Sequence, residues 1–458
     1  MSATRQSRSR SARVLQQAWD RTLRRRGSER ALVEASSGRA WTFAELETLA
    51  ADWRARHGDG ASTLAGQAVV FAVPNGAEWL GIFLALLRAG AVAVPLDAAE
   101  PPVAQRRMAE RLRAGFWWDG TKLVALDRPR RFRAPDVRLI KLTSGSTGEP
   151  RALPFTEAQL LADARQVTRS MGITAADLNY ALIPFGHSYG LGNLSIPLLG
   201  LGVPVVCATA PLPQAIADDF GRWQPTVMPG VPAIFRALAA SGIEPAALGS
   251  LRLAITAGAP LAPGAAAEFH TRFGRALHGF YGSSETGGIA YDRTGAATLA
   301  GSVGTAMPGV DLSLAPGGRL HVRSAAVFTT GNRRSERGVG CWVPPDRVER
   351  DARGRITLLG RRGVTVKIAG RRVSLTEVAA RLRQVPGVSD VWVGVGGGVE
   401  PALGAAVATT RPVAELRAEL QWDTPAWKIP KRWELAATLP LTPRGKVDAR
   451  GLQKKLFG

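Results

Sequence analysis

The chain has 458 residues, 45% of them hydrophobic, which is enough for about three domains and a sizeable buried core. Its two cysteines, Cys207 and Cys341, lie far apart outside any CxxC spacing, so we expect neither a disulfide framework nor a zinc site. This cysteine usage suits a protein of the reducing cytoplasm. The formal net charge of +22 is equally consistent with binding to polyanionic partners and with a solvated arginine-rich surface. The sequence contains no basic stripe interleaved with aromatic residues, so we do not expect nucleic acid to be the ligand.

The amino-terminal region predicts a basic tail followed by a parallel sheet. Residues 1–10 are arginine-rich and precede no apolar segment, which indicates a disordered tail rather than a secretory signal. An apolar run at Ala68–Val73, a helical pattern at Glu78–Gly90 and a second apolar run at Ala91–Pro95 predict a βαβ unit.

The same alternation continues through the middle of the chain. The expected elements are helix Thr156–Met171, strand Val203–Ala208, strand Thr226–Pro229, helix Pro232–Ala240 and strand Leu251–Ala257. The stretch from Tyr180 to Pro213 carries no Asp, Glu, Lys or Arg and is long enough to span a bilayer. Its repeated Pro and Gly instead favour a buried strand–loop–helix–strand passage, so no membrane insertion is expected.

Short strands become frequent after about residue 304. The expected strands there are Leu312–Leu314, Arg319–Val322 and Ile356–Leu359, and the elements beyond them are strand Thr365–Ile368, helix Leu375–Arg383 and strand Val388–Val395. We therefore expect an α/β fold. A large domain of parallel-rich sheets between helices spans residues 11–361, with a small β-rich subdomain at about 304–361. A small α+β domain spans residues 362–458.

The segment from Thr143 to Arg151 is rich in glycine and hydroxyl side chains. Its first residues are Thr143, Ser144, Gly145, Ser146, Thr147 and Gly148. Such a loop presents backbone N–H groups and hydroxyl donors to one concave space, as a polyphosphate requires. No GxxxxGK[ST] spacing fits it, which disfavours P-loop chemistry. By itself the segment is equally consistent with a surface linker.

Two further segments carry groups suited to a nucleotide. Tyr281 can stack on a base and lies four residues before Glu285, which can hold Mg²⁺. Lys446 lies in a Pro/Gly-bounded loop from which an ammonium can reach across a cleft. Taken singly, the first segment is also consistent with an ordinary turn, and the second is more typical of a solvated lysine.

Together and in this order, these segments resemble the adenylate-forming superfamily of acyl- and aryl-CoA ligases, carrier-protein ligases, peptide-synthetase adenylation domains and luciferases. The resemblance covers about residues 40–450 and rests on several independent motifs. It implies that the protein uses ATP and Mg²⁺ to activate a small carboxylic acid as its acyl-adenylate, and then passes the acyl group to a thiol.

The resemblance also implies residue roles. The nucleotide would be held by Thr143, Ser144, Gly145, Ser146, Thr147, Gly148 and Arg151 at the phosphates, by Gly258, Ala259, Pro260 and Tyr281 at the adenine, by Asp346 at the ribose and by Arg361 at the ribose or a phosphate, and Gly282 would also belong to the nucleotide site. The remaining implied roles belong to Ser284 at the α-phosphate or carboxylate, Glu285 at Mg²⁺, Lys446 in adenylation, Gly370 at the pantetheine tunnel and His187 as a gate of the acyl pocket. A satisfied core histidine is the alternative for His187.

Three positions depart from the family pattern. Arg151 replaces the usual lysine, and Gly363 stands at the hinge where relatives commonly carry Asp or Lys. Pro344–Pro345 replaces Thr-Gly before Asp346, so the loop that presents this aspartate is expected to be stiffer. Thr329–Asn332 is a competing but poorer match for the ribose motif.

The implied chemistry explains the need for a mobile small domain. A carboxylate that attacks an α-phosphorus needs in-line positioning and charge neutralisation, and it needs no general base. Lys446 would supply both effects, and it would then have to leave before the thiol reaches the adenylate. By resemblance, the small domain rotates about Gly363 between the two steps.

The expected acyl pocket is bounded by Pro184–Gly190, Thr226–Val231 and Gly258–Ala259. Amino-acid-activating relatives carry Asp after the aromatic residue of this motif, whereas Phe185 is followed here by Gly186. An uncharged acid, aromatic or fatty, is therefore favoured over an amino acid.

The basic charge suits either thiol acceptor, because carrier proteins present acidic helices and coenzyme A carries phosphates. The short chain favours an acyl carrier protein, with coenzyme A as the alternative. A non-catalytic nucleotide-binding regulator is a further alternative, which the joint presence of Glu285, Asp346 and Lys446 disfavours. A luciferase-type oxygenase would still form the adenylate first. No oligomeric state is indicated.

Overall fold

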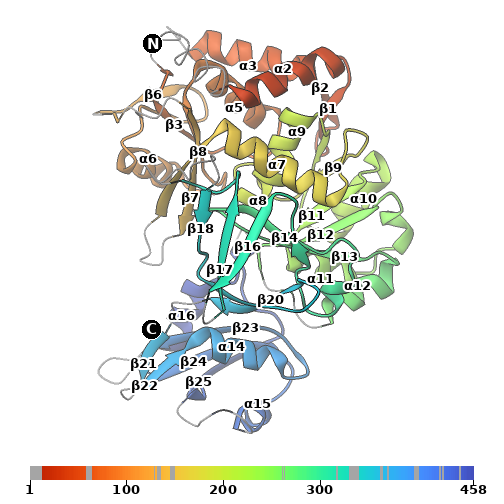
Figure 1. Ribbon diagram of the computed structural model, residues 1–458, viewed down its shortest axis with the longest axis vertical. Helices are drawn as coiled ribbons and strands as arrows, with labels where there is room; N and C mark the ends of the chain where they lie inside the picture. The colour runs from red at the N-terminus through yellow and green to blue at the C-terminus, as the bar shows by residue number, and fades with distance from the viewer. Residues whose placement is uncertain are drawn as a thin grey trace.

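The computed structural model describes residues 13–57, 64–127, 129–130, 136–144, 150–259, 261, 264–315, 318–329, 340–361, 365–368, 371–396, 402–421, 424, 428–442 and 445–458. Figure 1 shows a large part that contains two extensive sheets and, below it, a small part formed by the carboxyl-terminal residues.

The larger of the two main sheets has nine strands within the described residues. In spatial order they are β15 (Thr305–Ala306), β14 (Gly287–Tyr291), β13 (Leu277–Ser283), β12 (Leu253–Thr256), β11 (Val227–Gly230), β9 (Asn179–Ala181), β10 (Val205–Cys207), β1 (Arg30–Glu34) and β2 (Arg39–Thr42). The strands from β13 to β1 pair in parallel, whereas β14, β15 and β2 pair antiparallel. Parallel strands of this kind require cover on both faces.

The second main sheet has six strands among the residues described. In spatial order they are β6 (Leu123–Ala125), β5 (Phe116–Trp118), β3 (Ala68–Phe71), β4 (Val92–Pro95), β7 (Val137–Ser144) and β8 (Pro150–Thr156). Its inner strands β5, β3, β4 and β7 are parallel, and β6 and β8 close the two edges antiparallel.

Helices cover these sheets and fill the space between them (Figure 1). They are α2 (Val14–Arg26), α3 (Phe43–His57), α5 (Ala77–Ala89), α6 (Pro102–Arg111), α7 (Glu157–Met171), α8 (Ser188–Gly190), α9 (Ile196–Leu201), α10 (Pro213–Trp223), α11 (Pro232–Ala240), α12 (Ala265–Phe273) and α13 (Ala296–Leu299), with a π-turn η1 (Leu191–Ser195) and a 3₁₀ turn η2 (Pro245–Leu248). Helix α5 is mostly apolar and mostly buried apart from the exposed Glu78 near its start, and Trp79 stacks on Phe83 at 5.2 Å. Helix α7 begins at a capping box formed by Thr156 and Gln159.

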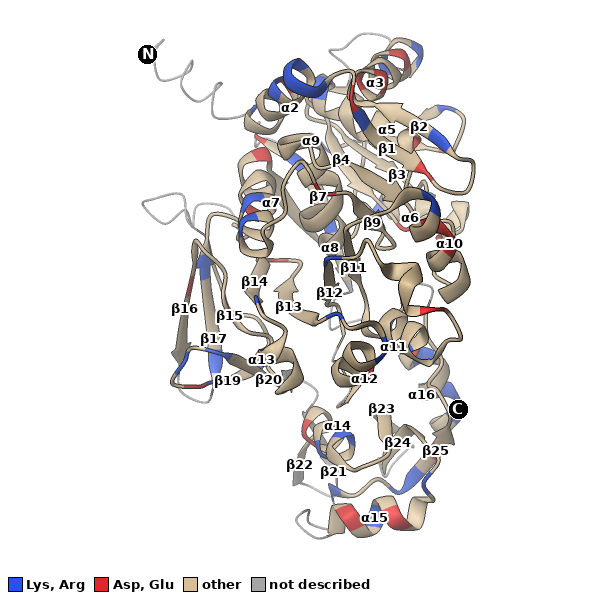
Figure 2. Cartoon of the chain, turned by 90° about the vertical axis from the view of Figure 1, so that its right-hand side faces the viewer, with Lys and Arg blue, Asp and Glu red and all other residues tan. Residues whose placement is uncertain are grey.

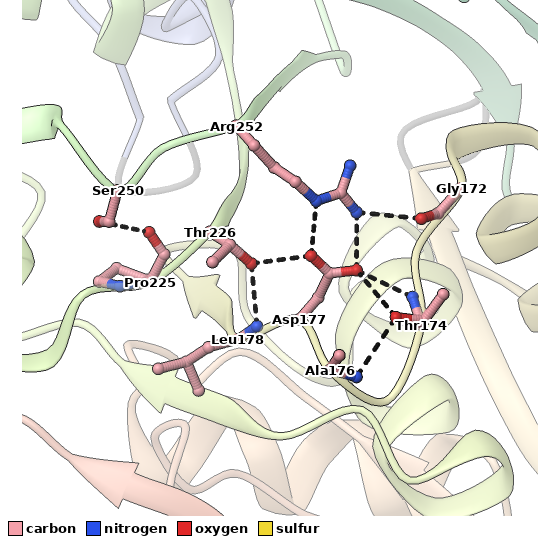
Figure 3. Close-up of polar contacts among 9 residues, drawn as sticks. All are labelled: Gly172, Thr174, Ala176, Asp177, Leu178, Pro225, Thr226, Ser250 and Arg252. Carbon is pink, nitrogen blue, oxygen red and sulfur yellow. Dashed lines mark hydrogen bonds and ion pairs between the residues drawn. The ribbon is translucent and has the colours of Figure 1, made fainter.

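A polar cluster ties together the amino ends of three neighbouring parallel strands (Figure 3). Asp177, which precedes β9, accepts two hydrogen bonds of 2.6 Å from the guanidinium of Arg252, which precedes β12. Thr226, which precedes β11, donates to Asp177 at 2.9 Å and accepts from the Leu178 N–H at 3.0 Å. Burial acts to raise the pKa of Asp177, but the hydrogen bonds from Arg252, Thr174 and Thr226 outweigh it and hold that pKa below its usual range. The cluster therefore fixes how the opposite, carboxyl ends of these strands line up.

The rest of the described chain forms a small antiparallel sheet and the carboxyl-terminal part. The sheet contains β16 (Val310–Ala315), β17 (Arg319–Ser324), β18 (Gly340–Trp342), β19 (Asp346–Arg350) and β20 (Ile356–Arg361). The carboxyl-terminal part contains β21 (Thr365–Ile368), β22 (Arg371–Ser374), α14 (Leu375–Gln384), β23 (Val388–Gly396), β24 (Ala402–Thr409), α15 (Val413–Gln421), β25 (Arg432–Ala436) and α16 (Ala449–Phe457). It has a hydrophobic cluster of its own around Val378, Leu382 and Val407.

The predicted fold class is confirmed. The βαβ unit is present as β3, α5 and β4, and the uncharged passage from Tyr180 to Pro213 forms strand, helical turns and strand as expected. One expectation was wrong: Asp346 begins strand β19 instead of lying in a loop. The strand was missed because two prolines precede it. Val348 is buried between the exposed Arg347 and Glu349, which is the alternation expected of a strand.

The predicted tail at residues 1–10, the hinge at Gly363 and the pantetheine position Gly370 lie outside the described residues. The boundaries of the three predicted domains stay predictions. Among the described helices, none has the length and apolarity required to cross a membrane.

Candidate active site

The predicted phosphate-binding segment is the connection of the β7–β8 hairpin. Thr143 pairs with Arg151 and Ser144 with Pro150 across the two strands, so Thr143 and Arg151 stand side by side at the base of the connection. The predicted loop residues 145–149 lie outside the described residues.

Arg151 lies against two aromatic rings, those of Trp342 on strand β18 and of Phe328, which follows strand β17. Its guanidinium carbon is 5.3 Å from the centre of the Trp342 ring and 5.9 Å from that of Phe328. Phe328 packs on Phe155 with ring centres 6.1 Å apart, and the Lys141 ammonium lies 4.1 Å from the centre of the Phe155 ring. Each cation lies within the range of a cation–π contact. The three rings thus form a row with a cation at each end.

Glu285 lies in the turn between β13 and β14 and is partly exposed. Its backbone carbonyl accepts a hydrogen bond of 2.7 Å from the Phe328 N–H. Gly282 is needed for the tight crossing of the hairpin, because a Cβ there would come within 2.6 Å of the Gly287 carbonyl oxygen. The turn therefore presents the Glu285 side chain at the edge where β13 ends.

Two buried charged residues near this turn, Asp163 and Lys141, were not found from the sequence patterns. Asp163 of α7 accepts a hydrogen bond of 2.9 Å from the Gly288 N–H. Burial raises the pKa of Asp163, opposed by Lys141 and by that N–H. Burial lowers the pKa of Lys141, opposed by the attraction of Asp163 and Glu285. The Glu285 turn is thus anchored to helix α7 next to a buried cation.

The donor set suits a magnesium ion that arrives with a nucleotide. Mg²⁺ at nucleotide sites is usually held by one or two carboxylates together with substrate phosphates. Glu285 supplies one such carboxylate, and the part of the chain that the structure describes contains no cluster of three or more His, Cys, Asp or Glu side chains able to hold a metal ion by itself.

Two residues predicted to hold the nucleoside touch each other. Tyr281 is buried on β13, and its phenol donates a hydrogen bond of 2.9 Å to the Asp346 carboxylate at the start of β19. Arg361 stands opposite Asp346 in the β19–β20 ladder. The candidate base-stacking and ribose-binding positions therefore come together from two different sheets.

Val231 joins the predicted adenine segment to the loop of Lys446. A Cβ at Gly258, whose φ is +86°, would lie 3.6 Å from Val231 Cγ1, and a Cβ at Gly445 would lie 3.0 Å from Val231 Cγ2. The loop that carries the exposed Lys446 is closed by hydrogen bonds of 2.6 Å from Thr442 N–H to Lys446 O and 2.9 Å from Gly445 N–H to Thr442 O.

The carboxyl-terminal part is docked on the large part at a second place. Arg236 of α11 donates a hydrogen bond of 3.3 Å to the Ser389 carbonyl on β23. Figure 2 shows α11 and α12 directly above α14 and β23. The Lys446 loop is therefore held next to the carboxyl ends of β11 and β12. Ala259 is exposed there, and Pro260 lies outside the described residues.

The segment after β9 forms the predicted wall of the acyl pocket. His187 caps helix α8, because its Nδ1 accepts the Tyr189 N–H at 3.3 Å. Its predicted role as a gate stays a prediction. The next residue, Ser188, donates a hydrogen bond of 3.0 Å to the Ser284 hydroxyl. The pocket wall and the Ser284–Glu285 turn are thus linked directly.

Tyr189 lies across the carboxyl ends of the paired strands β11 and β12. Its buried phenol donates to the Ile255 carbonyl at 3.0 Å and lies 3.5 Å from the Gly230 carbonyl oxygen, and its ring packs 5.6 Å from Phe280. Burial raises the pKa of Tyr189 well above its usual value, so the phenol stays a neutral donor.

Asn75 is another residue that sequence reasoning missed. Its side-chain oxygen accepts the Phe185 N–H at 2.7 Å, and its amide donates to the Ile183 carbonyl at 2.9 Å. Asn75 therefore shapes the pocket wall from a distant part of the chain. The Pro-Asn-Gly segment two residues after strand β3 was the available signal, because the carboxyl ends of parallel strands gather at one edge.

Comparisons with known proteins agree with this arrangement. The model of the family described as AMP-binding enzyme matches residues 19–117 and 113–327, more than half of the chain. Novobiocin biosynthesis protein H of Streptomyces niveus is 28% identical over 96% of this chain and 82% of that protein. Feruloyl-CoA synthase of an Amycolatopsis species is 27% identical over 95% of this chain and 98% of that protein.

Among solved structures, ATP-bound MatB from Rhodopseudomonas palustris superposes with a TM-score of 0.79 at 21% identity, covering 97% of this chain and 98% of that chain. At this level of sequence identity the structural similarity shows the fold alone. With the match of the family model over residues 19–327, these findings show that the chain belongs to the AMP-binding enzyme family.

Proposed function

We propose that this protein activates a compact aromatic carboxylic acid with ATP and transfers it to coenzyme A. In the first step a carboxylate oxygen attacks the α-phosphorus, the bond to pyrophosphate breaks, and an acyl-adenylate forms. In the second step the thiol sulfur attacks the acyl carbon, the bond to AMP breaks, and a thioester, AMP and a proton are released.

The position of the Lys446 loop carries this proposal. Gly445 packs against Val231, and Val231 also packs against Gly258. Val231 directly follows β11, which belongs to the expected acyl pocket. The lysine loop, the adenine segment and the pocket wall therefore meet at the Val231 side chain, as a reaction between an acid and the α-phosphate of ATP requires.

The proposed residue roles are those that the family resemblance implies, and the contacts described above support them. Arg151 attracts the outer phosphates, while Tyr281 and Asp346 hold the nucleoside. Lys446 neutralises charge as pyrophosphate departs. Glu285 would hold Mg²⁺, which supplies charge neutralisation at the phosphates.

The shape of the pocket favours a compact acid over a fatty one. Tyr189 lies in the expected pocket wall at the carboxyl ends of β11 and β12, and its buried phenol is bonded to the Ile255 carbonyl, so its ring takes up room that a long chain would need. Gly186 provides no charge for a substrate ammonium. The relative named feruloyl-CoA synthase, by its name, acts on an aromatic acid.

Coenzyme A is the better-supported acceptor, although the short chain had favoured a carrier protein. That argument from length loses its force because the chain covers 98% of the relative named feruloyl-CoA synthase. An acyl carrier protein remains the second candidate, since the net charge of +22 suits its acidic helices as well.

Exchange of labelled pyrophosphate into ATP, measured over a panel of benzoic, cinnamic, fatty and amino acids, tests the first step. We expect exchange with one or more aromatic acids. Adding coenzyme A or a holo carrier protein in parallel then tests the acceptor, with acyl-CoA as the expected product. ATP binding without exchange for any acid would support a non-catalytic regulator instead.

A further inference from the structure

The replacement of the usual lysine by Arg151 coincides with a row of aromatic rings at this position. Trp342 and Phe328 stand 5.3 Å and 5.9 Å from the guanidinium carbon and meet each other edge to face at 6.0 Å and 72°. A planar guanidinium stacks on aromatic faces in a way that a compact, strongly hydrated ammonium does not. The two rings thus suit arginine in particular.

Trp342 contributes the face of its ring, and not a hydrogen bond, to the contact with Arg151. Its indole N–H is buried and makes no hydrogen bond within the described residues. Trp342 is partly exposed on β18, whose partner β17 holds it through the Val322–Trp342 register. The ring is therefore fixed by the small sheet and offers its surface to the neighbouring hairpin.

Phe328 connects this contact to the candidate metal carboxylate. Its ring belongs to the aromatic row, and its N–H donates the 2.7 Å hydrogen bond to the Glu285 carbonyl. Arg151 and Glu285, which come from different sheets, are thus positioned by one segment of the chain. Since the phosphates and their metal must meet both groups at once, a common support fixes their relative place.

We propose that Trp342 and Phe328 form an aromatic platform that positions Arg151 for the phosphates of ATP. The inference rests on the proposed use of ATP and adds two positioning residues and a reason for the arginine. The platform limits the directions in which the long Arg151 side chain can point, so less conformational freedom is lost when the nucleotide binds.

A double-mutant cycle on ATP binding tests the platform. Trp342→Leu removes the ring and keeps an apolar side chain, Trp342→Phe keeps a ring, and Arg151→Lys keeps the charge. A cation–π contact of this exposure corresponds to about a two- to fivefold change in affinity. We expect Trp342→Leu to weaken ATP binding by that factor and to raise the KM for ATP while leaving kcat for pyrophosphate exchange nearly unchanged.

Rescue and coupling separate this role from general packing. We expect Trp342→Phe to bind ATP nearly as the wild type does, and Trp342→Leu to have little further effect once Arg151 is lysine. Trp41→Leu is the matched control. Trp41 faces Arg39 at 3.7 Å on the edge strand β2, away from the site, so its loss should leave ATP affinity unchanged.

Wild-type affinity in Trp342→Leu, or an equal loss in the lysine background, would overturn the platform while leaving the proposed function standing. If the wild type itself bound no ATP, the proposed function would fail, and the platform with it.

Discussion

Lys446 is a single exposed side chain whose proposed role belongs to one half-reaction. We predict that Lys446→Ala lowers acid-dependent pyrophosphate exchange on the order of 10²–10³-fold, because one donor to developing charge is lost. Transfer of the acyl group from a supplied acyl-adenylate should stay close to the wild-type rate. Lys431→Ala, which removes another exposed lysine of the carboxyl-terminal part, is the control. Equal loss in both steps would contradict the division of labour.

The hydrogen bond between Tyr281 and Asp346 offers a second test at the residue scale. Tyr281→Phe keeps the ring and removes the 2.9 Å bond to the carboxylate. We expect the KM for ATP to rise about tenfold, because a hydrogen bond to a charged group is lost beside the nucleoside. Tyr180→Phe removes a similar buried bond of 2.6 Å to Asp219 and should lower stability without changing that KM. A rise in KM in both variants would point to a general packing defect.

At the scale of elements, the cluster around Asp177 links the starts of β9, β11 and β12 and so supports the site from the opposite edge. We predict that Asp177→Asn lowers the free energy of unfolding by about 2 kcal/mol, because a nearly buried partner of Arg252 loses its charge. Chemical denaturation at neutral pH measures this. An unchanged midpoint would show that the cluster is dispensable.

The pH dependence of that difference has a definite sign. The pKa of Asp177 is depressed in the folded state. Its stabilising contribution is therefore present in full above its unfolded pKa of about 3.9 and declines as the pH falls through the lower folded value. The gap in stability between wild type and Asp177→Asn should shrink in acid, and a constant gap would disagree.

Local patterns predicted the elements well where hydrophobicity alone decides them. Helix Pro232–Ala240 and strand Thr365–Ile368 are found with the expected bounds, and strand β19 was missed because prolines precede it. The contact of Tyr281 with Asp346 could not be predicted from pattern, since it joins two sheets whose packing is a tertiary property. The same holds for Asp163 beneath the Glu285 turn.

At the scale of the whole molecule, the structure describes one placement of the carboxyl-terminal part, in which Gly445 lies on Val231. A Cβ at position 445 would stand 3.9 Å from that of Val231, within the roughly 3.5–4.5 Å of a disulfide. Val231→Cys combined with Gly445→Cys, in a Cys341→Ser background, should therefore form a cross-link on oxidation. The positive φ of +70° at Gly445 adds a modest strain.

We predict that the cross-linked protein keeps most of the pyrophosphate exchange of its reduced form and loses thioester formation, because the two steps need different placements of the lysine loop. Addition of a reductant should restore the thioester step, and the reduced double variant is the matched control. Undiminished thioester formation in the oxidised protein would rule out the rotation.

Val231 touches both the pocket side and the lysine side, and this couples two properties of the enzyme. A bulkier residue there, selected to exclude larger acids, would also push the Gly445 turn outward and slow activation of every acid. A smaller residue would widen the range of acids and weaken the contact that positions the Lys446 loop. Changes of substrate preference through this position would therefore need a compensating change in the turn, whereas changes at Ser188 or Tyr189 would not.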